Sequence, residues 1–293
     1  MVDFLNTSLS GLLAFQRALA TTSNNVANAS TPGFSRQETV FSSRTPEFFG
    51  GGFIGTGVNV SEVRRIFDGF LAGEVRSATA GEGRLDTLAT LSGRVGDLLG
   101  SRTGGFSAGL QSFFDSVQQL SNDPASTPVR EALLGEADSL ERRLGQLGRQ
   151  LGQIDTETAG RIEDSVANIN RLAQGIADVN ASIVASPGAA DGNFPSELLD
   201  QRERLLNELA GEVEVGTTMA DDGAMNVFIG NGQTLVLGQQ ASALEAGAGA
   251  FGPVSNAITA GGIDVTGQLT GGNLGGLLDF RREVLDPARN DLG

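Results

Sequence analysis

Paired carboxylates are the one catalytic option that this sequence leaves open. Cys, His and Lys do not occur among its 293 residues. Their absence excludes a Ser-His-Asp triad, a thiol nucleophile, a Schiff base and a P-loop lysine. Imidazole and thiolate also supply most transition-metal ligands, so we expect neither a metal site nor a cofactor.

Two groups of acidic residues could hold such a pair, namely Asp221-Asp222 and the set Glu157, Glu163 and Asp164. A glycosidase needs two carboxylates across a sugar-binding cleft, and such clefts usually offer Trp or Tyr platforms. The sequence contains neither aromatic type. Asp221-Asp222-Gly223 also lacks the alternating oxygen ligands and the distal Glu of a calcium loop. We interpret these acids as solvated side chains and keep a wall-degrading carboxylate glycosidase as the alternative from another class.

Two G-x-G-x-x-G strings, at 50–55 and 247–252, raise the possibility of a nucleotide site. That fingerprint needs a preceding buried strand and a following helix N-terminus. The first string is followed by a β-like run and the second by Pro253. With 42 glycines in the chain, such strings arise by chance, and no nucleotide is expected.

Charge is distributed unevenly along the chain, whose net charge is −15. Residues 1–65 hold four acids and five arginines, whereas residues 66–293 hold 31 acids and 15 arginines. The acidic excess disfavours nucleic acid or an anionic membrane as a partner. The most apolar N-terminal run, residues 12–15, is too short for a Sec signal or a membrane span, so we expect no membrane insertion.

The N-terminal segment has the pattern of an amphipathic, heptad-like helix that ends near Asn28. Its apolar positions follow a 4,3 spacing, with Gln16 and Ser23 filling two steps: Leu5, Leu9, Leu12, Leu19 and Val26. Burying its apolar side chains contributes at most about 10 to 15 kcal/mol. Ordering some 25 residues costs more, at about 1 to 2 kcal/mol each. This helix therefore needs neighbours on most of its faces.

The rest of the chain is predicted to be mainly helical. Residues 34–62 read as extended segments, and helices are predicted from Val63 to Leu98 with an interruption, over 106–120, from Thr127-Pro128 to Ile183, over 196–210 and over 274–292. The pattern between 213 and 237 predicts a small β meander with a hairpin turn at Asn231-Gly232, followed by a Gly-rich strand-like stretch to Gly272. The longest helix would span about 85 Å, and its spacing slips between Ile154 and Val166, as a stutter or a break would produce.

These elements predict a mainly α fold with a smaller β part, an elongated helical bundle with long coiled-coil-like helices. The predicted divisions are an N-terminal axial helix with an extended loop segment (1–62), a long helical bundle (63–211), a small β region (212–272) and the start of a further bundle helix (273–293). The last helix looks cut within its pattern, and we expect the chain to be truncated at its C-terminal end.

The N-terminal motif resembles a known family. The runs 9–19 (LSGLLAFQRAL) and 23–34 (SNNVANASTPGF) are similar to the motif shared by bacterial flagellar rod, hook and hook-associated proteins. The extension Ser35-Arg36-Gln37 and the block 271–289 resemble the hook-associated protein 1 family in particular, and 55–58 with 65–71 resemble its next block.

The resemblance implies a structural subunit without catalysis, which forms the junction between hook and filament. In that family the N-terminal helix pairs with a C-terminal helix in the inner wall of an axial tube, and the protein leaves the cell through the flagellar type III export apparatus with no cleaved signal peptide. The implied location is the extracellular flagellum. The implied partners are copies of the chain itself, the hook protein, the second junction protein (hook-associated protein 3) and the export apparatus.

On this interpretation the apolar residues Leu5, Leu9, Leu12, Leu19 and Val26 pack against neighbouring subunits. A helix-to-loop motif satisfies backbone groups where the helix ends and places the following loop, and its residues are Asn24, Asn25, Asn28, Thr31, Pro32, Gly33, Phe34 and Arg36. A flagellar rod or hook subunit and a generic coiled-coil adaptor remain as alternatives.

Overall fold

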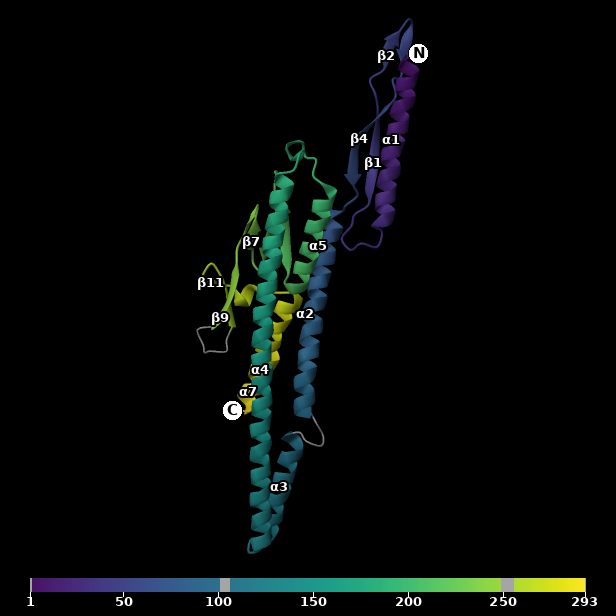
Figure 1. The fold of residues 1–293 in the computed structure, drawn as a ribbon. Helices are drawn as coiled ribbons and strands as arrows, with labels where there is room; N and C mark the ends of the chain where they lie inside the picture. The colour runs from purple at the N-terminus through teal and green to yellow at the C-terminus, as the bar shows by residue number, and fades with distance from the viewer. Residues whose placement is uncertain (1, 101–105, 249–255, 293) are drawn as a thin grey trace.

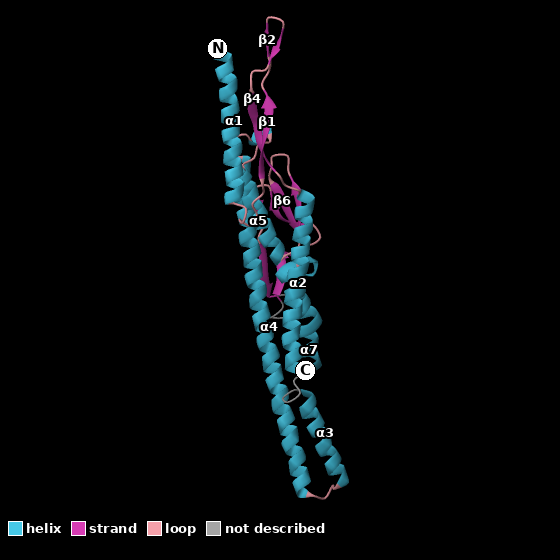
Figure 2. Cartoon of the chain, turned by 90° about the vertical axis from the view of Figure 1, so that its right-hand side faces the viewer, coloured by secondary structure: helices cyan, strands magenta, loops and turns pink. Residues whose placement is uncertain are grey.

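The computed structural model describes residues 2–100, 106–248 and 256–292. The molecule is elongated (Figures 1 and 2). At one end, residues 2–65 form a unit that we call the arm, and residues 69–292 form a helical body with small sheets on one side (Figure 1). A tip made of two helices projects from the other end of the body. Among the described helices, none is long and apolar enough to cross a membrane.

The arm consists of one helix and four strands: α1 (Val2–Ala27), β1 (Gln37–Ser43), β2 (Glu47–Phe49), β3 (Gly52–Ile54) and β4 (Val58–Arg65). The helices of the body are α2 (Gly69–Gly100), α3 (Phe106–Asn122), α4 (Thr127–Val184), α5 (Ser196–Glu212), α6 (Gly272–Phe280) and α7 (Asp286–Leu292). Its strands are β5 (Val215–Met219), β6 (Met225–Ile229), β7 (Gln233–Leu237), β8 (Gln240–Ala241), β9 (Leu244–Ala248), β10 (Asn256–Ala260) and β11 (Ile263–Asp264). The predicted fold class, mainly α with a smaller β part, is confirmed.

The long helix α4 is continuous through the region where the apolar spacing slips. Three of the inward positions there are polar, since Asp155, Thr158 and Ser165 are buried together with the apolar Ile162. Thr158 donates its hydroxyl to the carbonyl of Ile154 at 2.7 Å, which satisfies that group within the helix. The slip is therefore a change of residue type along an unbroken face, and the helix does not break.

The core lies where α4 meets α2, α5 and α6 and where the sheets pack on α4. Helices α2 and α6 approach closely because a Cβ at Gly276 would lie 2.6 Å from the carbonyl oxygen of Arg84. Further along, the first part of α4 packs against α3, and this antiparallel pair forms the projecting tip (Figure 1).

The β meander has the predicted order, because β5, β6, β7 and β8 pair antiparallel in sequence. Gly230 to Gly232 connect β6 and β7, with positive φ at both glycines. Asn170 and Asn180 of α4 attach the small sheets, since their amides bond to the backbones of β9 and of the β6–β7 region.

One boundary predicted from sequence is wrong. The helix predicted from Val63 begins at Gly69, because Val63 and Arg65 pair with β1 as part of β4. The helix predicted over 274–292 is present from Gly272 to Leu292 and contains a π-helical turn, Arg281–Leu285, where Arg281 pairs with Asp155 of α4. The string 50–55 covers the turn and second strand of the β2–β3 hairpin and is followed by β4 instead of a helix, and the string 247–252 falls partly outside the described residues.

Candidate functional site

Helix α1 lies along the β1–β4 hairpin (Figure 1). The residues that it turns toward these strands are small or polar. Ala14 is buried against the hairpin at 4% exposure. The Ser10 hydroxyl accepts a hydrogen bond from the Val58 amide at 3.2 Å, and Thr39 of β1 donates to the Thr21 hydroxyl at 3.0 Å. The face of α1 that contacts its own chain therefore contributes little apolar burial.

A close approach between helix and strand fixes one end of this contact. Gly57 has a φ of +114°, and a Cβ there would coincide with the Ser10 hydroxyl. Ser10 also donates to the Thr7 carbonyl at 2.7 Å, so its oxygen is held between helix and strand. Only glycine fits at this position without displacing α1.

The five predicted packing residues of α1 face away from the hairpin, whereas Phe15 pairs with Phe41 of β1 at 6.1 Å between ring centroids. Leu5, Leu12 and Leu19 recur every seven residues and are 67%, 57% and 67% exposed, while Leu9 and Val26 are 51% and 72% exposed. Residues seven apart lie on one helical face, and here that face is opposite the one holding Ser10 and Ala14. The packing residues predicted from sequence thus form one exposed apolar face, which no described residue covers.

The asparagines of the predicted motif lie at the end of α1. Asn25 makes a two-way bond with the Gln37 backbone, donating to its carbonyl at 2.8 Å and accepting from its amide at 2.9 Å. Asn28 donates to the side chain and the backbone carbonyl of Asn24, and Thr31 donates to Asn28 at 3.3 Å. These bonds attach the last turn of α1 to the start of β1.

The rest of the motif leads from α1 into β1. Thr31 and Pro32 are exposed, Phe34 is half-buried, and Gly33 has a φ of +77° with the Arg204 side chain directly against it. Arg36 is exposed, and its guanidinium has no ion pair among the described residues, while its carbonyl accepts from Ile66 at 2.8 Å.

A single carboxylate on α5 holds the arm to the body. Asp200 accepts the Ser35 amide at 3.2 Å and pairs with Arg65 at 2.7 Å, so it contacts both the loop after α1 and the end of β4. Arg65 and Asp200 side chains are each 10% exposed, and the Arg65 guanidinium also stacks 4.1 Å from the centre of the Phe67 ring. We call this cluster of Gly33, Ser35, Arg65, Phe67, Asp200 and Arg204 the joint.

Buried arginines surround the joint on the body side. Arg76 of α2 pairs with Glu203 at 2.5 Å, and Arg202 donates to the Gly223 carbonyl at 2.7 Å. Burial lowers the pKa of Arg202 to about 10, the neighbouring Glu203 opposes that shift, and Arg65 adds to it. Asp200 and Glu203 therefore supply the negative charge that this arginine-rich region of α5 requires.

Sequence reasoning missed the joint. Asp200 lies 135 positions from Arg65 in the chain, and no local pattern marks either residue as one of a pair. The sequence signal here is a helix predicted over 196–210, with acids on a face that proves to be buried.

We expect replacement of Asp200 by Asn to free the arm from its fixed orientation. The amide keeps the shape and can still accept the Ser35 amide, but it removes the charge that compensates Arg65. Tryptic cleavage after the exposed Arg36 should become about tenfold faster, which corresponds to a free energy of local opening that is lower by roughly 1.4 kcal/mol. Timed digestion followed by mass spectrometry measures the cleavage rate.

The matched control for this variant is Glu38→Gln, which removes a neighbouring pair with Arg64 in which both side chains are about half exposed. Its cleavage rate should stay at the wild-type value. Equal rates for wild type and Asp200→Asn would show that the Asp200 charge does not hold the arm.

The carboxylates considered for catalysis do not form a reaction centre. Glu157 is bound by Arg94 at 2.9 and 3.0 Å and by Arg161 at 2.7 Å, and the hydrogen bond from Arg94 lowers its pKa to about 2. Glu163 and Asp164 are exposed on α4, and Asp222 accepts the Ala224 amide in a turn. In the described part of the chain, no three acidic side chains lie together as metal ligands would.

Comparisons with known proteins agree with this arrangement. The family model described as "Flagellar hook-associated protein FlgK helical domain" matches residues 92–293, which comprise most of the body. A second model, "Flagella basal body rod protein", matches residues 5–34, which comprise α1 and the loop after it.

Curated relatives named "Flagellar hook-associated protein 1" match the whole chain. The Salmonella typhimurium protein is 36% identical over 299 residues, which cover 100% of this chain and 54% of the relative. The Escherichia coli K12 protein is 33% identical, with 100% and 55% covered. The chain thus spans about half the length of these relatives.

A solved structure shares the fold. It is "the flagellar hook junction protein FlgK from Burkholderia pseudomallei", with a TM-score of 0.67 and 28% identity over 75% of this chain and 41% of that one. The model matched over 92–293 covers well over half of the sequence, and the chain therefore belongs to the flagellar hook-associated protein FlgK family.

Proposed function

We propose that this chain is a structural subunit of the bacterial flagellum that forms part of the junction between hook and filament. It acts by packing its helices against other subunits and carries out no catalysis. The observation that carries the proposal is the orientation of α1, which turns large apolar residues to solvent and small or polar ones to its own hairpin. Exposed apolar faces of this size mark interaction surfaces in folded proteins.

The apolar face of α1, formed by Leu5, Leu9, Leu12, Leu19 and Val26, is the proposed subunit-packing surface. The motif from Asn24 to Arg36 sets the direction in which the arm leaves the body, through Asn25 on β1 and Gly33 on Arg204. In this proposal the division between arm and body follows the predicted division between an axial segment and a bundle.

The partners in this proposal are further copies of the chain, the hook protein and the second junction protein, hook-associated protein 3. The relatives are named for the hook, and the solved structure for the hook junction, which supports this placement. Export through the flagellar apparatus without a cleaved signal peptide, and an extracellular location in the flagellum, complete the proposal.

A rod or hook subunit is the second candidate, favoured by the rod-protein match over residues 5–34. That match is confined to the arm, whereas the body matches the hook-associated helical domain. We infer that the arm packs as it would in rod proteins and that the body assigns the subunit to the junction.

The test of this function is Leu12→Asp, in the middle of the exposed face of α1. A carboxylate there should abolish filament attachment and swimming, because burying it against a neighbouring subunit costs several kcal/mol. Because Leu12 is already 57% exposed, the thermal unfolding of the isolated chain should be unchanged. Motility and electron microscopy of complemented cells provide the measurement.

Leu237→Asp is the control for this experiment, since Leu237 is 61% exposed on β7, away from the arm. It should leave filaments attached. Normal filaments on cells with Leu12→Asp would overturn the proposed packing role of α1.

A further inference from the structure

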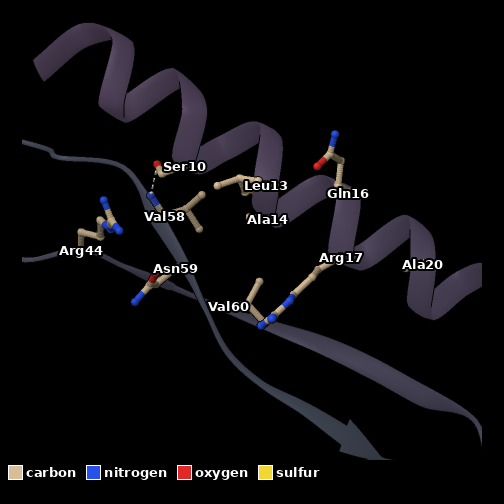
Figure 3. A pocket seen from close by; sticks show the side chains of 10 residues that line it. All are labelled: Ser10, Leu13, Ala14, Gln16, Arg17, Ala20, Arg44, Val58, Asn59 and Val60. Carbon is tan, nitrogen blue, oxygen red and sulfur yellow. Dashed lines mark hydrogen bonds between the residues drawn. The ribbon is translucent and has the colours of Figure 1, made fainter. Parts of the chain in front are cut away.

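A groove runs between α1 and the strand β4, beside the apolar face of α1. Its volume is about 500 Å³. Leu13, Ala14 and Ala20 form the helix side, and Val58 and Val60 form the strand side (Figure 3). Ser10, Gln16 and Asn59 also line it, so the groove combines apolar walls with polar side chains and is open to solvent along the arm.

Two arginines border this groove without a carboxylate partner. Arg17 reaches from α1 toward Val60, and Arg44 lies beside Asn59 (Figure 3). Neither guanidinium has an ion pair among the described residues. A groove with apolar residues on both walls and two unpaired cations is suited to the side of a helix that carries small or apolar residues flanked by acids.

We propose that the occupant is the outer face of α2 in a second copy of this chain. This inference rests on the proposed function and names the surface that the arm contacts. The α2 face has an apolar stripe repeating every seven residues, at Leu71, Ala78 and Leu85, with the two leucines 60% and 62% exposed. Glu74 and Glu82 lie on either side of it, exposed and without an ion pair in the described part of the chain.

The spacing of the charges agrees on the two surfaces. Arg44 donates its amide to the Gly57 carbonyl, beside the Val58 amide that bonds to Ser10, so Arg44 is level with Ser10. Arg17 lies seven residues further along α1, about 10.5 Å away at 1.5 Å per residue. Glu74 and Glu82 are eight residues apart, about 12 Å, within the reach of the two long arginine side chains.

Net charge favours a second copy of the chain as the partner, and it favours contact between the arm of one copy and the body of the other. Residues 1–65 carry one excess positive charge, whereas the remainder of the chain carries sixteen excess negative charges. Two bodies repel each other, but an arm attracts a body. Since α2 begins where the arm ends (Figure 1), a copy shifted by about one arm length along the long axis brings its α2 beside the first arm. The contact is heterologous, because it joins two different surfaces of the chain, and it repeats from copy to copy.

The absence of Cys from this chain makes disulfide trapping a direct test. Cells are made to express two forms of the full protein together, one with Ala20→Cys in the groove and one with Ala78→Cys on α2. Isolated flagella are then oxidised. A disulfide-linked dimer should form only when both forms are present, because bonding requires Cβ atoms within about 4 Å. Leu71→Cys and Leu85→Cys in place of Ala78→Cys test the neighbouring registers of the same stripe.

Ser77→Cys provides the matched control, since it is exposed on α2 next to Ala78 but about 100° around the helix. It should give no dimer. Arg17→Glu together with Arg44→Glu should lower the dimer yield about tenfold, and Glu74→Arg with Glu82→Arg in the other copy should restore it.

Two results would overturn this inference: no dimer in any register of the stripe, or an equal yield with Ser77→Cys. If these occur while Leu12→Asp still abolishes filament attachment, the proposed function stands and only this contact is wrong. If Leu12→Asp is also without effect, the proposed function itself fails.

Discussion

Replacing Asp155 by Ala is expected to lower the free energy of unfolding by about 3 to 5 kcal/mol. The Asp155 side chain is only 3% exposed in the middle of α4, and it pairs with Arg289 at 2.5 Å and with Arg281 at 3.4 Å. Arg281 is itself only 12% exposed, so the variant leaves a buried cation without its carboxylate. The π-helical turn and α7 should detach from α4 as a result.

Urea denaturation followed by circular dichroism of the helices measures this effect, because the chain has no Trp or Tyr for fluorescence. Glu157→Ala is the control two residues away. Glu157 also pairs with two arginines but is 41% exposed, so its loss should cost at most about 1 kcal/mol. Similar losses for the two variants would contradict the role assigned to burial.

Asn180→Leu is expected to have an effect of similar size, about 4 kcal/mol, through a different mechanism. Asn180 is fully buried and donates to the carbonyls of Met225 and Gly238 at 2.8 and 2.7 Å. It also accepts from the Met225 amide at 3.0 Å and from Arg202 at 3.2 Å. Leucine has a similar size but leaves these buried polar groups without a partner, and each costs about 1 to 3 kcal/mol.

The same denaturation experiment applies, with Asn168→Leu as the control. Asn168 is exposed on α4 and makes only a 3.5 Å contact with Glu212, so the cost should stay below about 1 kcal/mol. If Asn180→Leu were as stable as wild type, α4 would be held to the sheet by apolar contacts alone.

The sequence predicts the elements of this fold well where periodicity is strong. Helix α1 ends within a residue of Asn28. Helix α4 begins at Thr127, where Pro128 marks the first turn, and its N-cap is Ser126, which makes no side-chain capping bond. The meander was predicted from alternation and an Asn-Gly turn. The boundary at Val63 failed because β-branched and charged residues of a half-exposed strand also fit a helical pattern.

What could not be predicted depends on contacts between distant residues. The leucine spacing of α1 predicts an apolar face, but it does not show that this face points away from the hairpin. That orientation follows from Ser10, Thr21 and Asn25, whose partners lie on β1 and β4. The polar residue Asp155 looked like an interruption of the α4 pattern because Arg281 and Arg289 lie more than 120 residues away.

The joint determines how the molecule carries mechanical load. Helix α4 extends for 58 residues through the body as one stiff rod, and the sheets and α5 brace its second half. The arm, by contrast, is connected to the body by one stretch of backbone, residues 66–68, and by the noncovalent contacts of the joint, among them those of the Asp200 carboxylate. Force or torque passing between arm and body crosses that narrow section, so the joint is the compliant element and bending concentrates there.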